Sequence, residues 1–255
     1  MKKVLFTDLD GTILFSKSSL PKELKIENCV VAETYRNGHF GYMEKELVAF
    51  FKEWTQEQLF IPVTTRSTEQ YERLADCFST FNLPFALASN GGNLYRYGRL
   101  DLEWQAATKQ ELRKELNQKE LVLELIQKMI PATSIRKIKD SDELYYCVLT
   151  IERIWEEKFI LEVNKELAKW GWCAYFQHKK LYFLPKALSK ERGITRLKEE
   201  LAESAHYLAM GDTEMDYRML KQQDQYLYFS GFSEKNLETT TYSLEKIQTL
   251  LEGWK

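Results

Sequence analysis

Short apolar segments alternate with helical segments at both ends of the chain, and this alternation limits the possible folds more than any other feature. Strands are predicted at 4–6, 59–63, 84–88, 207–210 and 226–229. Helices are predicted at 43–58, from Ser67 onward, at 189–204, at 214–222 and at 242–253. Strands separated by helices indicate a parallel sheet covered on both faces. We therefore predict an α/β protein with a doubly wound parallel sheet as its core.

The middle of the chain has a different pattern. It combines a long charged helical stretch, a strand, an amphipathic helix and a hairpin, at 104–130, 145–151, 153–170 and 172–184. We interpret it as an inserted α+β domain at 86–185, between the two parts of a discontinuous core at 1–85 and 186–255. Residues 16–42 are polar, contain Asn37-Gly38 and Gly41, and are expected to be irregular.

Composition excludes several classes of protein. Lys and Arg total 36 and Asp and Glu total 38, so the net charge of -2 gives no general attraction to nucleic acid or an anionic membrane. No apolar run approaches the ~18 residues that span a bilayer. The four cysteines are scattered without a CxxC pair, as a reducing compartment permits. We expect a cytoplasmic protein without nucleic-acid or membrane partners, and its oligomeric state stays open.

Polar side chains follow several of the predicted strands. Asp8 and Asp10 follow the first strand, Thr64 the second and Asp212 a later one, while Lys190 begins the helix after the hairpin. The carboxyl ends of parallel strands meet at one edge of the sheet, so these groups are expected to converge. Clustered carboxylates need a cation, and Mg²⁺ prefers carboxylate, water and phosphate oxygens. This combination is typical of phosphoryl transfer.

Each group has a plausible role in that chemistry. Asp8, at the strand tip, is placed to attack phosphorus and form an aspartyl phosphate. Asp10 lies on the same side of an extended chain and would protonate the leaving oxygen, then activate water. Thr64 and Lys190 would bind the phosphoryl oxygens, and Asp212 would complete the metal site. Gly11 would let the turn approach its ligand closely.

Four segments resemble, in order, the motifs of the haloacid dehalogenase superfamily. They are Asp8–Thr12, Pro62–Arg66, Leu184–Lys190 and Gly211–Asp216. The third is similar to the lysine motif of the Cof-type, class IIB branch, whose members carry a cap between the second and third motifs. The resemblance implies a Rossmann-like core, a type B C2 cap and Mg²⁺-dependent hydrolysis of small phosphomonoesters, often sugar phosphates.

The resemblance also implies residue roles. It assigns Asp8 as nucleophile and metal ligand, and Asp10 as acid/base and as metal ligand through its backbone carbonyl. The metal would also be bound by Asp212 and Asp216. The phosphate would be bound by Thr64, Thr65, Lys190 and Gly11, and the substrate by Arg66, Asn90 and Gly91. Three features depart from the family pattern. Met215 stands where Asn is common, Thr65 where Gly is common, and residues 230–232 do not match the usual ending.

Ordinary structural roles compete with these assignments. The Asp8–Gly11 segment resembles an Asx turn, Asp212 a helix N-cap and Asn90-Gly91 a hairpin turn. Arg66 is equally suited to a surface ion pair, and Lys186 competes with Lys190 for the lysine role. In the cap, successive strand residues point to opposite faces of the sheet, so about half of the candidate substrate-binding side chains would face the substrate. Those candidates are Tyr175, Gln177, His178, Lys180 and Tyr182.

The predicted function is hydrolysis of a small phosphorylated metabolite, with a phosphosugar as the leading substrate class and Mg²⁺ as cofactor. A phosphomutase is the first alternative, because it would use the same four motifs. A catalytically silent phosphometabolite-binding regulatory protein is the second, and Met215 and the altered ending favour it. Isomerised product without free phosphate would identify the mutase, and binding without turnover would identify the regulatory protein.

Overall fold

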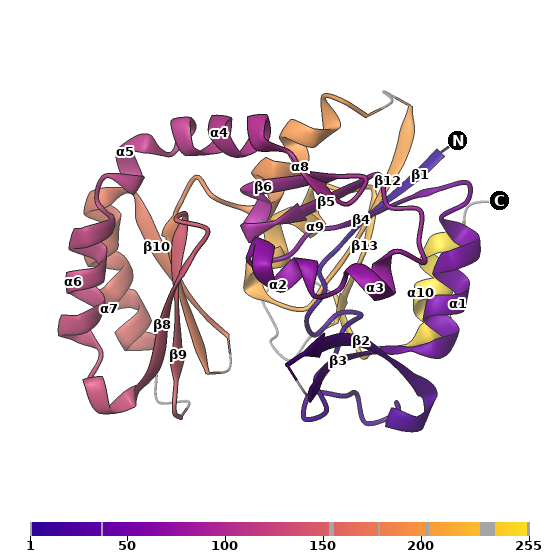
Figure 1. The fold of residues 1–255 in the computed structure, drawn as a ribbon, viewed down its shortest axis with the longest axis horizontal. Coiled ribbons are helices and arrows are strands. Elements are labelled where there is room, and N and C mark those ends of the chain that lie inside the picture. Colours follow the sequence, from indigo (N-terminus) through magenta and orange to yellow (C-terminus); the bar gives the residue numbers. More distant parts are fainter. Residues whose placement is uncertain are drawn as a thin grey trace.

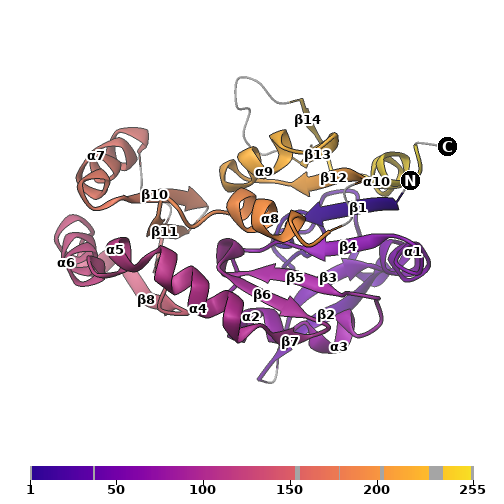
Figure 2. The same cartoon turned by 90° about the horizontal axis from the view of Figure 1, so that it is seen from above.

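The computed structural model describes residues 2–36, 38–152, 156–177, 179–201, 204–229 and 238–253. A parallel sheet forms its centre (Figures 1 and 2). Its strands are, in spatial order, β14 (Thr239–Thr240), β13 (Gln225–Phe229), β12 (Ala205–Gly211), β1 (Lys2–Thr7) and β4 (Leu59–Pro62). All neighbours in this sheet are parallel. β5 (Phe85–Ala88) follows β4 through a parallel bridge between Val63 and Leu87.

Alternate residues of β1 pack against helices on opposite faces of the sheet. Leu5 belongs to an apolar cluster with residues of α1 (Lys45–Trp54), α2 (Thr68–Glu72), α3 (Ala75–Phe78) and α10 (Leu244–Glu252). Val4 and Phe6 belong to a second cluster with residues of α4 (Leu102–Glu111), α8 (Lys190–Lys198) and α9 (Tyr217–Lys221). Strand periodicity therefore buries both faces of the sheet. The predicted doubly wound α/β class is confirmed.

A second, antiparallel sheet stands beside the core at the left of Figure 1. Its strands are, in spatial order, β10 (Trp172–Gln177), β11 (Lys180–Pro185), β9 (Tyr145–Thr150) and β8 (Ile135–Ser141). Residues of α6 (Lys119–Met129) and α7 (Glu157–Leu167) pack on one face around the fully buried Trp172. We call this sheet, with α5 (Arg113–Leu116), α6 and α7, the cap.

The segment before the cap packs on the core. Leu87 of β5, Leu94 of β6 (Asn93–Arg96) and Trp104 of α4 share one apolar cluster with Val4 and Phe6. The short strand β7 (Arg99–Leu100) pairs with β6. The division into domains stays a prediction, and this packing leads us to propose that the cap begins near residue 112 rather than at 86.

Several local predictions were wrong. The region expected to be irregular contains an antiparallel hairpin of β2 (Cys29–Tyr35) and β3 (Gly38–Glu44), and α1 begins only after it. The helix expected over 104–130 is divided into α4, α5 and α6. Strand β8 was not predicted, because it lies at the edge of the cap sheet and several of its charged residues face solvent.

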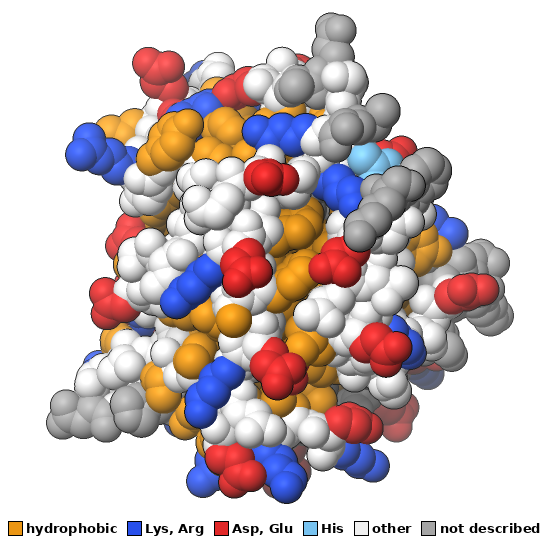
Figure 3. Space-filling view, turned by 90° about the vertical axis from the view of Figure 1, so that its right-hand side faces the viewer, with side chains coloured by type: hydrophobic (Ala, Val, Ile, Leu, Met, Phe, Trp, Pro, Cys, Tyr) orange, Lys and Arg blue, Asp and Glu red, His pale blue; other side chains and the backbone are white. Residues whose placement is uncertain are grey.

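The end of the core farthest from the cap has a mixed surface. Figure 3 shows acidic and basic side chains interspersed on this face, with apolar side chains between them. Such interspersed charge is typical of an ordinary solvated surface. Within the described ranges, no helix is both long enough and apolar enough to cross a membrane.

Candidate active site

Three neighbouring core strands deliver polar groups to one edge of the sheet. Asp8 directly follows β1, Asp212 directly follows β12, and Thr64 lies two residues beyond β4. The spatial order β12-β1-β4 makes these three carboxyl ends adjacent. The backbone N–H of Asp8 donates to the carbonyl of Met210 at 2.9 Å, which fixes the end of β1 against the end of β12. The convergence expected from the sequence is therefore present for these groups.

Lys190, the first residue of α8, lies between two carboxylates. Its side chain is 1% exposed, and Nζ donates to Asp8 Oδ1 and, at 2.6 Å, to Asp216 Oδ1. Burial alone would lower the pKa of Lys190, but the charges of Asp216 and Asp8 raise the pKa above its ordinary value. The ammonium is therefore charged where a phosphoryl group would meet Asp8. Lys186, the competing lysine, is exposed.

Asp216 supports the loop that carries Asp212. Its Oδ2 accepts hydrogen bonds from the N–H of Asp212 at 3.2 Å, and from the N–H and the hydroxyl of Thr213 at 3.0 and 2.8 Å. Because Lys190 occupies the other oxygen, both oxygens of this buried carboxylate already have protein donors. This arrangement favours a supporting role for Asp216 beneath the metal site predicted from the sequence.

Gly11 lies directly against Asp212. It has a φ of +89°, and a Cβ placed on it would stand 2.2 Å from Asp212 Oδ2. Any side chain there would be strained and would displace the carboxylate, so this turn requires glycine. Thr12, the residue after Gly11, donates from its hydroxyl to Asp212 Oδ1 at 3.3 Å and so helps to position the same carboxylate.

Asp8 and Asp212 could bind a divalent cation, with Asp216 directly behind them. One oxygen each from Asp8, Asp212 and Asp216 lies within 4.8 Å of the others. Burial raises the pKa of Asp8 to about 6, opposed by the Lys190 charge and assisted by that of Asp216. Burial, together with the charges of Asp8 and Asp216, raises the pKa of Asp212 well above its ordinary value. A hard cation would relieve this repulsion, so the donor set fits Mg²⁺.

We expect Mg²⁺ to raise the melting temperature by several degrees at about pH 7.5 and to have little effect at about pH 5. In the folded protein the pKa of Asp8 is raised above its ordinary value, so folding disfavours the ionised carboxylate. The metal-free protein therefore loses stability as the pH rises through about 6. The cation offsets that loss only where the carboxylates are ionised. Thermal denaturation at both pH values with Mg²⁺ or EDTA measures the effect. Asp212→Asn should largely remove it, and an equal Mg²⁺ shift in that variant would contradict the site.

Asp10 is held by Arg66, which comes from the loop after β4. Nε and Nη2 of Arg66 donate to the two carboxylate oxygens of Asp10 at 2.7 and 2.8 Å, as a bidentate pair. Burial acts to raise the pKa of Asp10, but the charge and hydrogen bonds of Arg66 outweigh it, and the pKa lies below its ordinary value. Nη2 also donates to Glu33 of β2, a residue that the sequence interpretation missed.

The other predicted phosphate and substrate residues organise nearby loops. Thr64 is buried, and its Oγ1 accepts the backbone N–H of Arg66 at 3.1 Å. The carbonyl of Thr65 accepts the phenol of Tyr145 from the cap. Asn90 donates from its backbone N–H to Thr64 and from Nδ2 to the carbonyl of Leu188. The carbonyl of Gly91 accepts the indole N–H of Trp104. Asn90 and Gly91 thus link the loop after β5 to its neighbours.

The cap directs one sheet face toward the core. Strand pairing places Tyr175 opposite Tyr182 and Gln177 opposite Lys180, so these four candidates share a face. His178 lies outside the described residues. Tyr182 packs in a cluster with Leu188, which just precedes α8. The positive charge of Lys180 also lowers the pKa of Asp10, so this cap residue is electrostatically coupled to the site.

A cavity of about 270 Å³ lies between cap and core, and its lining includes Ser189 and Glu191, the residues on either side of Lys190. Its walls include Tyr175 of the cap and, from the core, Asn90, Met215 and Ser189, the last of which directly precedes Lys190. Oδ1 of Asn90 and Oγ of Ser189 are buried without a hydrogen-bond partner. Met215, which replaces the usual amide of the fourth motif, therefore forms part of a cavity wall.

The tip of the β8–β9 hairpin docks the cap onto the core through Asp142. Its carboxylate accepts the N–H and hydroxyl of Thr68 at 2.9 and 2.7 Å, the hydroxyl of Ser89, and Nδ2 of Asn93 at 3.1 Å. Ser89 and Asn93 are fully buried. Thr68 begins α2, four residues after Thr64, so the cap is attached next to the loop that carries Thr64 and Arg66.

A model of the haloacid dehalogenase-like hydrolases matches residues 55–226, well over half of the chain. The chain belongs to this family. The match confirms the family expected from the four motifs, and the enzyme class is that of a hydrolase.

Several solved structures share the fold of this chain. The sucrose-phosphatase of Synechocystis, solved with sucrose and phosphate, has a TM-score of 0.61 at 14% identity, covering 90% of this chain and 83% of its own. A trehalose-6-phosphate phosphatase related protein scores 0.56 at 15% identity, covering 98% and 96%. The IMP-bound, N-terminally truncated IMP-nucleotidase of Plasmodium falciparum scores 0.58 at 14% identity, covering 98% and 67%. No curated protein matches the chain significantly.

Proposed function

We propose that this haloacid dehalogenase-like hydrolase is a Mg²⁺-dependent phosphatase that cleaves a small phosphorylated metabolite through an aspartyl phosphate on Asp8. The observation that carries the proposal is the meeting of Asp8, Lys190 and Asp212 at adjacent strand ends. A buried carboxylate beside a buried ammonium combines a nucleophile with a group that neutralises an incoming phosphoryl oxygen. The repulsion among the clustered carboxylates is the reason to expect a bound cation.

The reaction proceeds in two displacements. Asp8 attacks phosphorus, the bond from phosphorus to the leaving oxygen breaks, and Asp10 donates a proton to that oxygen. Water then attacks the aspartyl phosphate while Asp10 accepts its proton, which releases phosphate, frees the Asp8 carboxylate and returns Asp10 to its protonated form. Mg²⁺, held by Asp8 and Asp212 with Asp216 beneath them, would supply charge neutralisation for the phosphoryl group.

Arg66 keeps Asp10 ionised, so the proton needed for the first displacement has to be acquired as the substrate arrives. A phosphate dianion beside Asp10 adds negative charge, which raises the pKa of this carboxyl and favours its protonation. Lys190 meanwhile remains charged between its two carboxylates and stabilises the charge that builds up on the phosphoryl oxygens.

A phosphosugar is the proposed substrate class. Sucrose-phosphatase and the trehalose-6-phosphate phosphatase related protein share the fold, and the cavity lined by the neighbours of Lys190 is small and partly polar. The polar side chains of Asn90 and Ser189 in its lining are suited to hydroxyl groups of a leaving sugar. IMP is the contrasting substrate to test, because an IMP-nucleotidase also shares the fold.

The test is phosphate release from sucrose 6-phosphate, trehalose 6-phosphate, other hexose phosphates, IMP and p-nitrophenyl phosphate, with Mg²⁺ and with EDTA. We expect Mg²⁺-dependent release and a preference for sugar phosphates. Chromatography of the products separates the alternatives. Isomerised phosphosugar without free phosphate would instead establish a mutase, and ligand-induced thermal stabilisation without any turnover would establish a binding protein.

A further inference from the structure

The β2–β3 hairpin is attached directly to the loop that carries Asp10. Phe15 and Tyr42 exchange backbone hydrogen bonds of 2.9 and 2.8 Å, which join that loop to β3. Asp10 itself forms a backbone bridge with Leu14. The hairpin, inserted between the first motif and α1, is therefore an extension of the catalytic loop and lies below the sheet in Figure 1.

An irregularity in the hairpin turns an acidic residue inward. Strand register shifts on both sides of Glu33, and the adjacent residues Ala32 and Glu33 are both buried. In a regular strand, neighbouring side chains face opposite sides, so a β-bulge explains why both point inward. Gly41 stands opposite, and a Cβ there would lie 2.9 Å from Cβ of Glu33. The bulge and this glycine together make room for a buried carboxylate.

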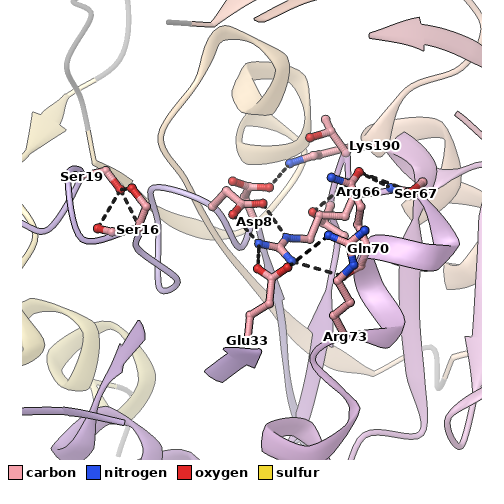
Figure 4. A network of polar contacts seen from close by, with 12 residues as sticks. Asp8, Ser16, Ser19, Glu33, Arg66, Ser67, Gln70, Arg73 and Lys190 are labelled. Atoms are coloured by element: carbon pink, nitrogen blue, oxygen red, sulfur yellow. Dashed lines mark hydrogen bonds and ion pairs between the residues drawn. The ribbon is translucent and has the colours of Figure 1, made fainter. Parts of the chain in front are cut away.

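The Glu33 carboxylate binds the arginine that holds Asp10. Oε2 accepts from Arg66 Nη2 at 2.9 Å (Figure 4). Nε and the same Nη2 form the bidentate pair with Asp10. Nη1 donates to the carbonyl of Gln70 at 3.2 Å. Arg66 is only 10% exposed, so its guanidinium is fixed on three sides in one orientation. Without Glu33, Nη2 of Arg66, which also binds Asp10, would lose one of its two acceptors.

A second arginine completes the network behind Glu33. Arg73 Nη1 lies 3.6 Å from Glu33 Oε1, Arg73 Nη2 binds Glu69 at 2.6 Å, and the guanidinium stacks over Tyr35 at 3.8 Å. Charges thus alternate from Asp10 through Arg66, Glu33 and Arg73 to Glu69. Glu69 is largely exposed and does not contact Arg66, so it provides a matched glutamate control within the same network.

We propose that Glu33 is a positioning residue for proton transfer, which acts by fixing Arg66 and, through it, the carboxylate of Asp10. The proposal rests on the proposed phosphatase function and gives the inserted hairpin a role in it. Misplacing an acid by a fraction of an ångström weakens proton donation to the leaving oxygen. Attack of Asp8 on phosphorus is affected much less, because Glu33 does not touch Asp8, Lys190 or Asp212.

Leaving-group chemistry distinguishes positioning from a structural role. A sugar alkoxide is strongly basic and needs a proton as it departs, whereas nitrophenolate departs without one. kcat/KM covers the steps up to formation of the aspartyl phosphate, in which the leaving group departs. We expect Glu33→Ala to lower kcat/KM for the best sugar phosphate roughly 10- to 100-fold, and that for p-nitrophenyl phosphate by no more than about threefold.

The variants to compare are Glu33→Ala, Glu33→Gln, Glu69→Gln, Asp10→Asn, Arg66→Ala and the double variant Glu33→Ala/Arg66→Ala. Glu33→Gln keeps the size and one acceptor, so it should restore part of the loss and carries the test if Glu33→Ala fails to fold. Glu69→Gln should match the wild type. Asp10→Asn should show the same substrate selectivity more strongly. In the double variant, Glu33→Ala should add no further selectivity to that of Arg66→Ala.

The outcomes separate this proposal from the proposed function. An equal loss for both substrates, unchanged rates in Glu33→Ala and Glu33→Gln, or the same loss in Glu69→Gln would each overturn the positioning role while leaving the phosphatase assignment intact. Absence of phosphate release by the wild-type protein from either substrate would overturn the proposed function, and the role of Glu33 with it.

Discussion

Replacing Asp8 by Asn should abolish turnover and leave the fold intact. An amide is not a nucleophile toward phosphorus, and loss of a covalent nucleophile lowers kcat by roughly 10⁴- to 10⁶-fold in enzymes of this kind of mechanism. The melting temperature at neutral pH should stay the same or rise, because burial and Asp216 disfavour the charge that the substitution removes. Phosphate release and thermal denaturation measure the two effects.

Asp76→Asn is the matched control for this substitution. Asp76 is an exposed residue of α3, so the same chemical change there should alter neither activity nor stability by a measurable amount. The wild-type protein should incorporate phosphate from its substrate in a form that hydroxylamine removes, and Asp8→Asn should not. This result would support the covalent intermediate. Turnover at more than about one per cent of the wild-type rate in purified Asp8→Asn would exclude Asp8 as the nucleophile.

Replacing Lys190 by Met should have the largest effect on stability. The substitution leaves Asp8 and Asp216 buried without the ammonium that both carboxylates contact. Removing one partner from a buried ionic group costs about 3–5 kcal/mol. We expect a decrease of that size in the free energy of unfolding, measured by urea denaturation at neutral pH, together with loss of phosphate release.

Two comparisons make the Lys190 result specific. Lys186→Met, four residues earlier and exposed, should keep the wild-type free energy of unfolding. The loss in Lys190→Met should shrink at lower pH, because protonation of Asp8 removes one of the uncompensated charges. The pKa of Asp8 is about 6 beside the ammonium, which lowers it, so the pKa rises further when Lys190 is replaced. An equal loss at pH 7 and pH 5 would argue that packing, rather than charge, accounts for the effect.

The strand-end residues were predictable because they depend on local pattern and on one rule of topology. Asp8 and Asp212 each follow an apolar strand directly, and parallel strands place their carboxyl ends together. Lys190 required the motif resemblance, since nothing in the local sequence distinguishes a buried lysine from an exposed one such as Lys186. Its burial follows from the position of α8 over the strand ends, which only the complete fold defines.

The hairpin and its glutamate were not predictable in the same way. Glu33 is buried through a bulge that breaks strand alternation, so the two-residue period that identifies strands is lost at the residue that matters. The pairing of Glu33 with Arg66 joins segments far apart in the sequence, and no local signal encodes it. The division of residues 104–130 into three helices was likewise hidden, because the breaks near Leu112 and Asn117 contain neither glycine nor proline.

The docking of Asp142 has a kinetic consequence. When the hairpin tip leaves the core, the half-buried donors of Thr68 and the buried donors of Ser89 and Asn93 lose their shared acceptor, and water has to enter to replace it. We expect the barrier to that hydration to slow separation of the cap from the core. For the proposed phosphosugar substrates, release of the leaving sugar, and with it turnover, should then depend on the lifetime of these Asp142 contacts.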